Sequence, residues 1–171
     1  LYAGSLGKYF RNSLGSFPKS HFLKVEDGVI INSKNNLKHL KNKFKIGVSW
    51  KSFKNRYFKD KSIELQDLKK IVNIPDCDFI NVQYGNIFQE LENFNKLNNN
   101  KIHTIKDIDI YNDFKSLAAL LKNLDLFISV SNSTAHLAGA LGVKTLLIKP
   151  FNHATFHYWN YDNNKTPWYE S

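Results

Sequence analysis

Residues 126–141 read Leu-Phe-Ile-Ser-Val-Ser-Asn-Ser-Thr-Ala-His-Leu-Ala-Gly-Ala-Leu. The first five, Leu126–Val130, resemble strands of parallel sheets, which are covered on both faces and therefore lack regular polar alternation. A short polar turn follows, and residues 135–141 have the small and apolar side chains of a closely packed helix. Gly142 stands where a glycine commonly ends a helix. A strand that leads directly into a helix predicts a βα unit and an α/β fold.

The same alternation of strands and helices extends outward through residues 44–171. We expect further strands and helices whose ranges follow from apolar runs, helical spacing and turn residues. Residues 1–43 are irregular and punctuated by glycines, and no core element is expected there. The sequence thus predicts a Rossmann-like parallel sheet with helices on both faces, preceded by an irregular segment. The expected strands are 44–50, 79–83, 102–105 and 145–148, the last ended by Pro150, and the expected helices are 63–72 with Ser62 as N-cap, 87–97, and one starting at Asp113 or Ser116.

Composition excludes several classes of protein. The chain has 171 residues and 42% apolar residues, which is enough for one folded domain and too many for disorder. No apolar run approaches the roughly 18 to 20 residues of a membrane span, so a soluble, cytoplasmic protein is expected. Cys77 is the single cysteine, which rules out an internal disulfide. The net charge is +9, but Arg11 and Arg56 are the only arginines, which disfavours a nucleic-acid surface.

The polar turn Ser131–Thr134 is the strongest candidate site. A helix that begins directly after a buried strand presents backbone N–H groups and the positive end of its dipole at the carboxyl edge of the sheet. Ser131, Asn132, Ser133 and Thr134 would add small polar side chains there, and His136 lies one turn into the helix. A phosphate or diphosphate suits this arrangement. The alternative is an ordinary capping cluster beside a structural histidine.

Two further groups are expected at the same edge. The loop after residues 44–50 carries Ser49, Lys51 and Lys61, together with Arg56 and Lys59, and these cations and hydroxyls suit a diphosphate. A solvated lysine loop would have the same sequence. Glu90 opens the helix after residues 79–83, where a carboxylate accepts hydrogen bonds from ribose hydroxyls. The alternative for Glu90 is a first-turn glutamate favoured by the helix dipole.

Other chemistries lack their usual motifs. No Gly-x-Gly-x-x-Gly or phosphate-binding P-loop follows a strand, which disfavours a dinucleotide dehydrogenase and a P-loop enzyme. No Gly-x-Ser-x-Gly is present for a serine hydrolase. His153 and His157 have a spacing that metal ligands use, but no glutamate or cysteine completes a known motif. We therefore expect neither a metal nor a cofactor.

Seven blocks occur in an order that resembles a known family: 44–50, 61–63 before a helix, 79–83 with Gly85, Glu90 with Leu91, 124–130, 136–142 and 167–169. The chain is similar, over residues 44–171, to the C-terminal half of GT-B glycosyltransferases related to the ADP-heptose:lipopolysaccharide heptosyltransferases. It is most similar to the bacterial enzymes of this family that carry tetratricopeptide repeats. The block at residues 136–142 is the most specific.

This resemblance implies a bacterial two-domain enzyme that transfers a sugar from a nucleoside diphosphate to a hydroxyl. Residues 44–171 would be its Rossmann-like donor-binding domain. An N-terminal domain, absent from this sequence, would bind the acceptor and supply the catalytic carboxylate, so no catalytic residue is expected here and the isolated chain should be inactive. Residues 1–43 would be the segment between the two domains.

The resemblance also assigns roles within the site. It places Lys61 against the donor phosphate and Glu90 near the ribose, and the remaining contacts at Ser49, Lys51 and the helix start. Ser131 and Asn132 stand where the family usually has Asp followed by Ser or Thr, which leaves open a non-catalytic interaction domain that kept the fold and lost the ligand. The aromatic tail would pack on the missing domain, and its exposure here predicts self-association. This tail comprises Phe151, Phe156, Tyr158, Trp159, Tyr161, Trp168 and Tyr169.

Overall fold

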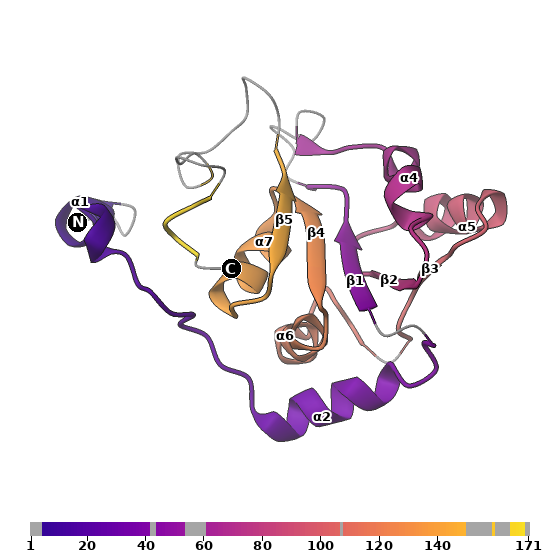
Figure 1. Cartoon of the computed structure of the whole chain (residues 1–171), viewed down its shortest axis with the longest axis horizontal. Coiled ribbons are helices and arrows are strands. Elements are labelled where there is room, and N and C mark those ends of the chain that lie inside the picture. The colour runs from indigo at the N-terminus through magenta and orange to yellow at the C-terminus, as the bar shows by residue number, and fades with distance from the viewer. Residues whose placement is uncertain are drawn as a thin grey trace.

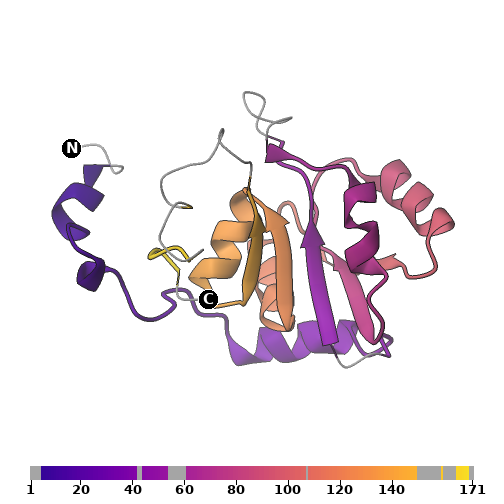
Figure 2. The ribbon, with the colours of Figure 1, turned by 45° about the horizontal axis from the view of Figure 1, so that its top comes forward.

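The chain forms a five-stranded parallel sheet, as the sequence predicts (Figure 1). The computed structural model describes residues 5–41, 44–53, 61–106, 108–149, 159 and 165–169. The strand order is β3-β2-β1-β4-β5, and all four pairings are parallel (Figure 2). The α/β, Rossmann-like class is therefore confirmed. The strands are β1 (Phe44–Ser49), β2 (Cys77–Asn81), β3 (Ile102–His103), β4 (Leu126–Val130) and β5 (Thr145–Ile148).

Helices connect the strands and cover the sheet. The helices are α1 (Gly7–Phe10), η2 (Leu14–Ser16), α2 (Asp27–Asn36), η3 (Leu65–Leu68), α4 (Lys69–Val72), α5 (Phe88–Leu97), α6 (Phe114–Lys122) and α7 (Ser133–Ala140).

Some predicted features fall outside the described residues: Arg56, Lys59, Pro150, His153, His157 and four members of the aromatic tail, Phe151, Phe156, Tyr158 and Tyr161.

The sheet separates two apolar cores, one on each face. Successive strand residues point to opposite faces, so Phe79 packs in one core and Ile80 in the other, and Phe127 and Ile128 divide in the same way. One core includes residues of α6 and α7 together with Leu37 and Leu40 just beyond α2, and the other includes residues of η3, α4 and α5. The predicted helices on both faces are thus present. Their burial explains why β1, β2 and β4 are apolar without regular polar alternation.

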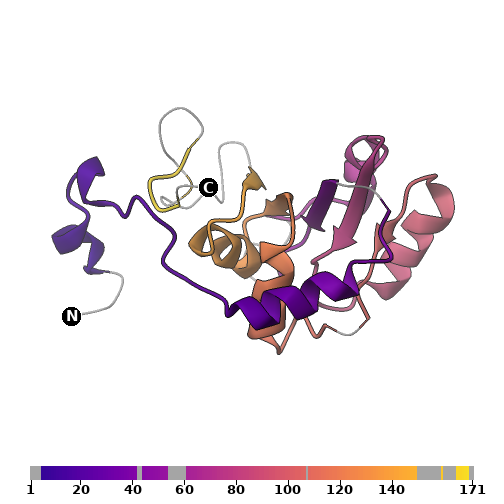
Figure 3. The same cartoon turned by 60° about the horizontal axis from the view of Figure 1, so that its bottom comes forward.

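Helix α2 leads into core residues in a segment for which the sequence analysis expected no core element. It lies alongside α6 (Figure 3), and the chain just beyond its end buries Leu37 and Leu40 in the core of that face. Within α2 itself the buried residue is Ser33, and Ile31 is exposed. Because α2 has no continuous apolar stripe, its sequence carries no helical periodicity of apolar residues.

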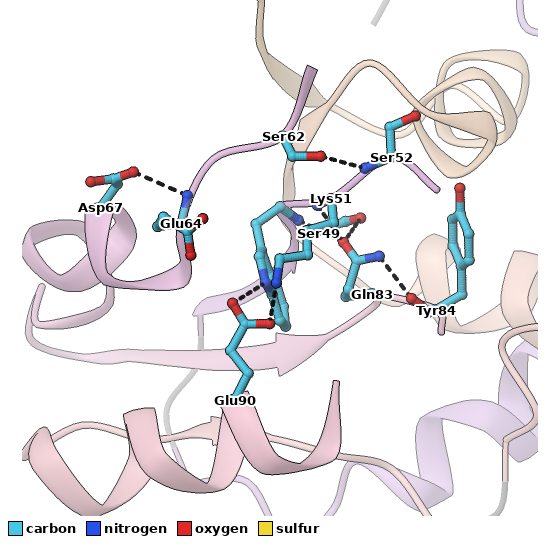
Figure 4. Close-up of polar contacts among 10 residues, drawn as sticks. Ser49, Lys51, Ser52, Ser62, Glu64, Asp67, Gln83, Tyr84 and Glu90 are labelled. Carbon is cyan, nitrogen blue, oxygen red and sulfur yellow. Dashed lines mark hydrogen bonds and ion pairs between the residues drawn. The ribbon is translucent and has the colours of Figure 1, made fainter. Parts of the chain in front are cut away.

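The predicted helix over 63–72 is two shorter elements. A 3₁₀ turn, η3, precedes α4, and Glu64 is the N-cap residue of η3 in place of the predicted Ser62. Asp67 Oδ2 accepts a hydrogen bond from Glu64 N at 3.1 Å, which fixes this start. Ser62 Oγ accepts instead from Ser52 N at 3.1 Å and joins the loop after β1 to the chain before η3 (Figure 4).

Helix α7 begins at Ser133, two residues earlier than predicted. Asn132 is its N-cap, since its side chain accepts from Ala135 N. The helix ends with Leu141 as C-cap, and Gly142 follows with φ of 70°, as the sequence predicts. No helix within the described residues has both the length and the apolar character needed to cross a membrane.

The segment before α2 is anchored at the other end of α7. Phe22 N and Leu23 N both donate to Ala140 O, at 3.1 and 3.0 Å. Earlier in the segment, the rings of Phe17 and Trp168 make an edge-to-face contact with centroids 5.0 Å apart. Residues 17–23 therefore lie beside the C-terminal residues 168 and 169, although almost the whole sequence separates them.

Candidate functional site

The candidate site lies where the strand order reverses. β1 connects outward to β2 on one side and pairs with β4 on the other, and ligands of open α/β sheets bind at the carboxyl edge of such a reversal. Ser49 is the last residue of β1, and Ser131–Thr134 follow β4 directly. The structure therefore brings these two predicted segments together, since adjacent parallel strands end at the same edge.

Asn132 joins these two segments with its side chain. Nδ2 donates to Ser49 Oγ at 2.8 Å and to Lys51 O at 3.3 Å, while Oδ1 accepts from Ala135 N at 3.0 Å. The Asn132 residue is only 6% exposed. Its amide is therefore satisfied inside the protein, and it acts on the site by positioning the start of α7 against β1.

Gln83 organises the end of β1 and was missed by the sequence analysis. Its Oε1 accepts three hydrogen bonds, from Ser49 Oγ at 3.0 Å, Trp50 N at 2.8 Å and Lys51 N at 2.7 Å (Figure 4). Its Nε2 donates to Tyr84 O at 2.8 Å, and the residue is 1% exposed. The sequence did carry a signal for this role, because Gln83 is a polar residue next to a buried apolar strand. A polar side chain in that position needs hydrogen-bond partners inside the protein.

Lys51 and Glu90 bind each other. Lys51 Nζ lies 2.6 Å from Glu90 Oε2, and Trp50 Nε1 donates to Glu90 Oε1 at 3.3 Å (Figure 4). Both residues are partly buried. The two residues were predicted to contact phosphate and ribose, respectively. The structure places both at the carboxyl edge, where each partly neutralises the other.

Ser133 and Thr134 face a pocket. The backbone amides of both residues donate no hydrogen bond to another described residue, whereas the next amide, of Ala135, is capped by Asn132. Beside them is a pocket of about 350 Å³, which Tyr84 and Tyr111 also line. Ser133 is exposed and Thr134 is only 3% exposed, so the Ser133 end of the predicted cradle, at the positive end of the α7 dipole, is the part open to an anion.

Ser131 and His136 contact the C-terminal residues. Trp159 Nε1 donates to Ser131 Oγ at 2.8 Å, and the Trp159 ring stacks on the His136 ring with centroids 4.5 Å apart. Tyr169 Oη lies 2.7 Å from His136 Nδ1. The sequence analysis expected His136 to face a ligand, and it did not anticipate these two aromatic neighbours. Contacts between residues so distant in sequence leave no local pattern.

Lys61 is close enough to act on His136 electrostatically. Burial lowers the pKa of His136 below its usual value, and the positive charge of Lys61 lowers it further. Lys61 is itself buried, at 6% exposure. A buried lysine and a neutral imidazole therefore lie near the start of α7, on the side that the C-terminal aromatic residues cover.

Comparison with known proteins gives one similarity to report. No family model matches the chain, and no solved structure matches it. Protein FlbA of Caulobacter vibrioides is 28% identical over 152 residues, which cover 86% of this chain and 26% of FlbA. The chain thus spans about a quarter of the length of FlbA. The name of FlbA states no substrate and no reaction.

The nine predicted site residues fall into three groups at one edge of the sheet. The first is the buried network of Ser49, Lys51, Asn132 and Glu90, which Gln83 and Trp50 complete. The second is the exposed Ser133 and the buried Thr134 beside it, both of which line the pocket. The third is Ser131, Lys61 and His136 beside Trp159 and Tyr169. Among the described residues, no three His, Cys, Asp or Glu side chains gather as metal ligands would.

Proposed function

We propose that the chain binds a nucleoside-diphosphate sugar and is the donor-binding half of a glycosyltransferase. The observation that carries the proposal is the start of α7, where the amides of Ser133 and Thr134 face a pocket at the point of strand-order reversal. Such a position combines directed N–H donors with a helix dipole, and both favour a diphosphate.

The surroundings of these amides suit the remainder of a nucleotide. The pocket has a volume of about 350 Å³, within the range of small-molecule sites, and its walls are largely aromatic and aliphatic. The rings of Tyr84 and Tyr111 have centroids 6.1 Å apart and offer flat apolar surfaces to a base. A second pocket, of about 310 Å³, shares both tyrosines and extends the space toward Asn86 and Asp109.

In the proposed reaction, this half of the enzyme stabilises the leaving group. As the bond between the sugar and the diphosphate breaks, negative charge grows on the diphosphate oxygens. The Ser133 and Thr134 amides and the cation of Lys61 would stabilise that charge. A carboxylate of an acceptor-binding domain would remove the proton of the attacking hydroxyl, as the family resemblance implies.

Calorimetric titration of the chain with ADP, UDP and inorganic pyrophosphate tests the proposal. We expect at least one nucleotide to bind, and Ser133→Glu to weaken that binding about tenfold or more, because the new carboxylate repels the diphosphate at close range. Ser20→Glu is the matched control, since it adds the same charge at an exposed serine before α2. If neither nucleotide binds wild type better than Ser133→Glu, the proposal is wrong.

A second candidate function is a non-catalytic interaction domain that has kept the fold without the ligand. The observation that favours it is that most of the predicted ligand residues already have partners inside the protein, and Ser49 and Asn132 bind each other. Lys51 and Glu90 pair with each other, and Trp159 and Tyr169 contact Ser131 and His136. This function predicts no nucleotide binding in the same titration, together with full folding of the chain.

A further inference from the structure

The His136 ring is held on two sides by residues of the C-terminal segment. Trp159 stacks on one face, with an interplanar angle of 23° and centroids 4.5 Å apart. Tyr169 Oη lies 2.7 Å from Nδ1, and the two rings are inclined at 62°. His136 is half-buried and Trp159 is 9% exposed. This is a fixed environment for an imidazole beside the start of α7.

The slot for the Tyr169 ring is built into α7. A Cβ on Gly139 would lie 2.5 Å from Tyr169 Cγ, so the ring occupies the space that the missing side chain leaves. The described neighbour that needs this space is Tyr169. Phe22 stacks beside this ring, with centroids 6.4 Å apart and an interplanar angle of 26°. The position of the Tyr169 hydroxyl is therefore set by packing as well as by its hydrogen bond.

We propose that Tyr169 is a positioning residue for His136, and that its hydroxyl donates to Nδ1 and so holds the neutral imidazole with its proton on Nε2. A phenol is a stronger donor than acceptor, and the unprotonated nitrogen of a neutral imidazole is a good acceptor. The 2.7 Å separation is that of a short hydrogen bond.

The charges around His136 support the neutral ring. Burial disfavours imidazolium and lowers the pKa of His136, and Lys61 is the charged group among the described residues that lowers it further. Tyr169 is a titratable group in direct contact with the ring. With Nδ1 occupied by Tyr169, the remaining nitrogen is an N–H donor.

The consequence for the ligand rests on the proposed function. On that function, an Nε2–H whose direction is set by Tyr169 and Trp159 would donate to a phosphate oxygen or a sugar hydroxyl of the donor substrate near the start of α7. Tyr169 would thus contribute to ligand affinity without touching the ligand, through the orientation and the tautomer of His136. The C-terminal residues would then contribute to ligand binding and would not serve only as a surface for another domain.

Nitrogen-15 NMR of the histidine rings over a pH range tests the proposal without any ligand. We expect the wild-type His136 ring to be unprotonated at Nδ1 and protonated at Nε2 at neutral pH. In Tyr169→Phe the ring still fills the Gly139 slot, but the bond that favours the neutral imidazole is lost, so the pKa of His136 should rise. Tyr9→Phe, which removes a hydroxyl from the exposed Tyr9 of α1, should leave it unchanged.

Two results would overturn the assignment. A proton on Nδ1 in wild type would make His136 the donor and Tyr169 the acceptor. An unchanged or lower pKa of His136 in Tyr169→Phe would show that the hydroxyl does not stabilise the neutral ring. His136→Gln identifies the resonances of His136 by their disappearance, so a structural disturbance elsewhere is not mistaken for the signal.

Calorimetry with ADP and UDP then separates this inference from the proposed function. If the wild type binds a nucleotide, we expect Tyr169→Phe to bind it about three- to tenfold more weakly, the effect of one hydrogen bond. Equal affinity of the two proteins would refute the role of Tyr169 in binding. If the wild type binds neither nucleotide, the proposed function fails, and the tautomer and the direction of the pKa change still decide whether Tyr169 positions His136.

Discussion

Asn132 donates a hydrogen bond to Ser49 across the boundary between β4 and β1, with 2.8 Å between Nδ2 and Oγ. The same side chain caps α7 through Ala135 N. One residue therefore fixes both the start of the helix and its position relative to the neighbouring strand. This double role explains why an asparagine stands at a position where the resemblance assigns a donor contact.

Replacement of Asn132 by alanine should destabilise the fold by about 2 kcal/mol. The change removes the N-cap, which is worth about 0.5–2 kcal/mol, and the donor to the buried Ser49 hydroxyl. The free energy of unfolding is measured by urea denaturation. Ser133→Ala, at the adjacent exposed residue, should change it by less than about 0.5 kcal/mol. Equal effects of the two substitutions would contradict the role of Asn132.

Gln83→Leu should cost about 2–4 kcal/mol of stability. Leucine has a similar volume but no oxygen, so three donors at the end of β1 would lose their shared acceptor. Urea denaturation of this variant is compared with that of Gln89→Leu, which removes an exposed glutamine from α5 and should have little effect. A loss below about 1 kcal/mol for Gln83→Leu would mean that water or other groups replace the acceptor.

Glu90→Gln should strengthen the binding of inorganic pyrophosphate, because the substitution leaves the Lys51 cation without its neutralising carboxylate. The expected gain is about two- to fivefold, in line with the modest energies of partly exposed ion pairs. The matched control is Glu92→Gln, on the same helix, where the glutamate pairs with the exposed Lys96.

The same Glu90 variant also tests the ribose contact that the resemblance implies. If Glu90 contacts ribose, binding of ADP should weaken while binding of pyrophosphate strengthens, and calorimetry measures both. Unchanged pyrophosphate affinity would show that Glu90 does not control the charge of the site.

Gly139→Ala should destabilise the protein, although alanine is the better helix former by about 1 kcal/mol. The added Cβ would meet the Tyr169 ring at 2.5 Å, and overpacking of this kind costs about 1–3 kcal/mol. In a Tyr169→Ala background the clash is absent, and the same substitution should instead stabilise the chain. The two pairs of unfolding free energies form a double-mutant cycle, and a coupling near zero would show that the ring does not occupy this slot.

Stability should fall as the pH is lowered from 7 to 5. Burial is the main cause that lowers the pKa values of His136 and His103 in the folded protein. Between each lowered value and the usual value near 6.5, the unfolded chain binds more protons than the folded chain, so the free energy of unfolding decreases as the pH falls. His136→Gln should reduce this slope, and adding His103→Gln should reduce it further. If the free energy of unfolding of the double variant falls with pH as steeply as that of wild type, the lowered pKa values of His136 and His103 are contradicted.

The sequence by itself determined the elements that have a strong local signal. β4 and β5 occur at their predicted bounds, and α6 begins at Phe114, next to Asp113, which is one of its two predicted starts and is the N-cap. The strand-to-helix turn at residues 131–134 also indicated the edge of the sheet at which the candidate site lies. Apolar runs, helical spacing and capping residues involve neighbours a few positions apart, so these features are visible in one sequence.

Only the tertiary structure decided the partners of the predicted site residues. Ser49 and Asn132 are 83 positions apart, Lys51 and Glu90 are 39 apart, and His136 and Tyr169 are 33 apart. Whether a cation, a carboxylate or an imidazole faces a ligand or another side chain depends on which strands are adjacent and where the C-terminal residues pack. The partner of each side chain depends on which groups are buried together and which hydrogen bonds they can form. No spacing in the sequence indicates these partners.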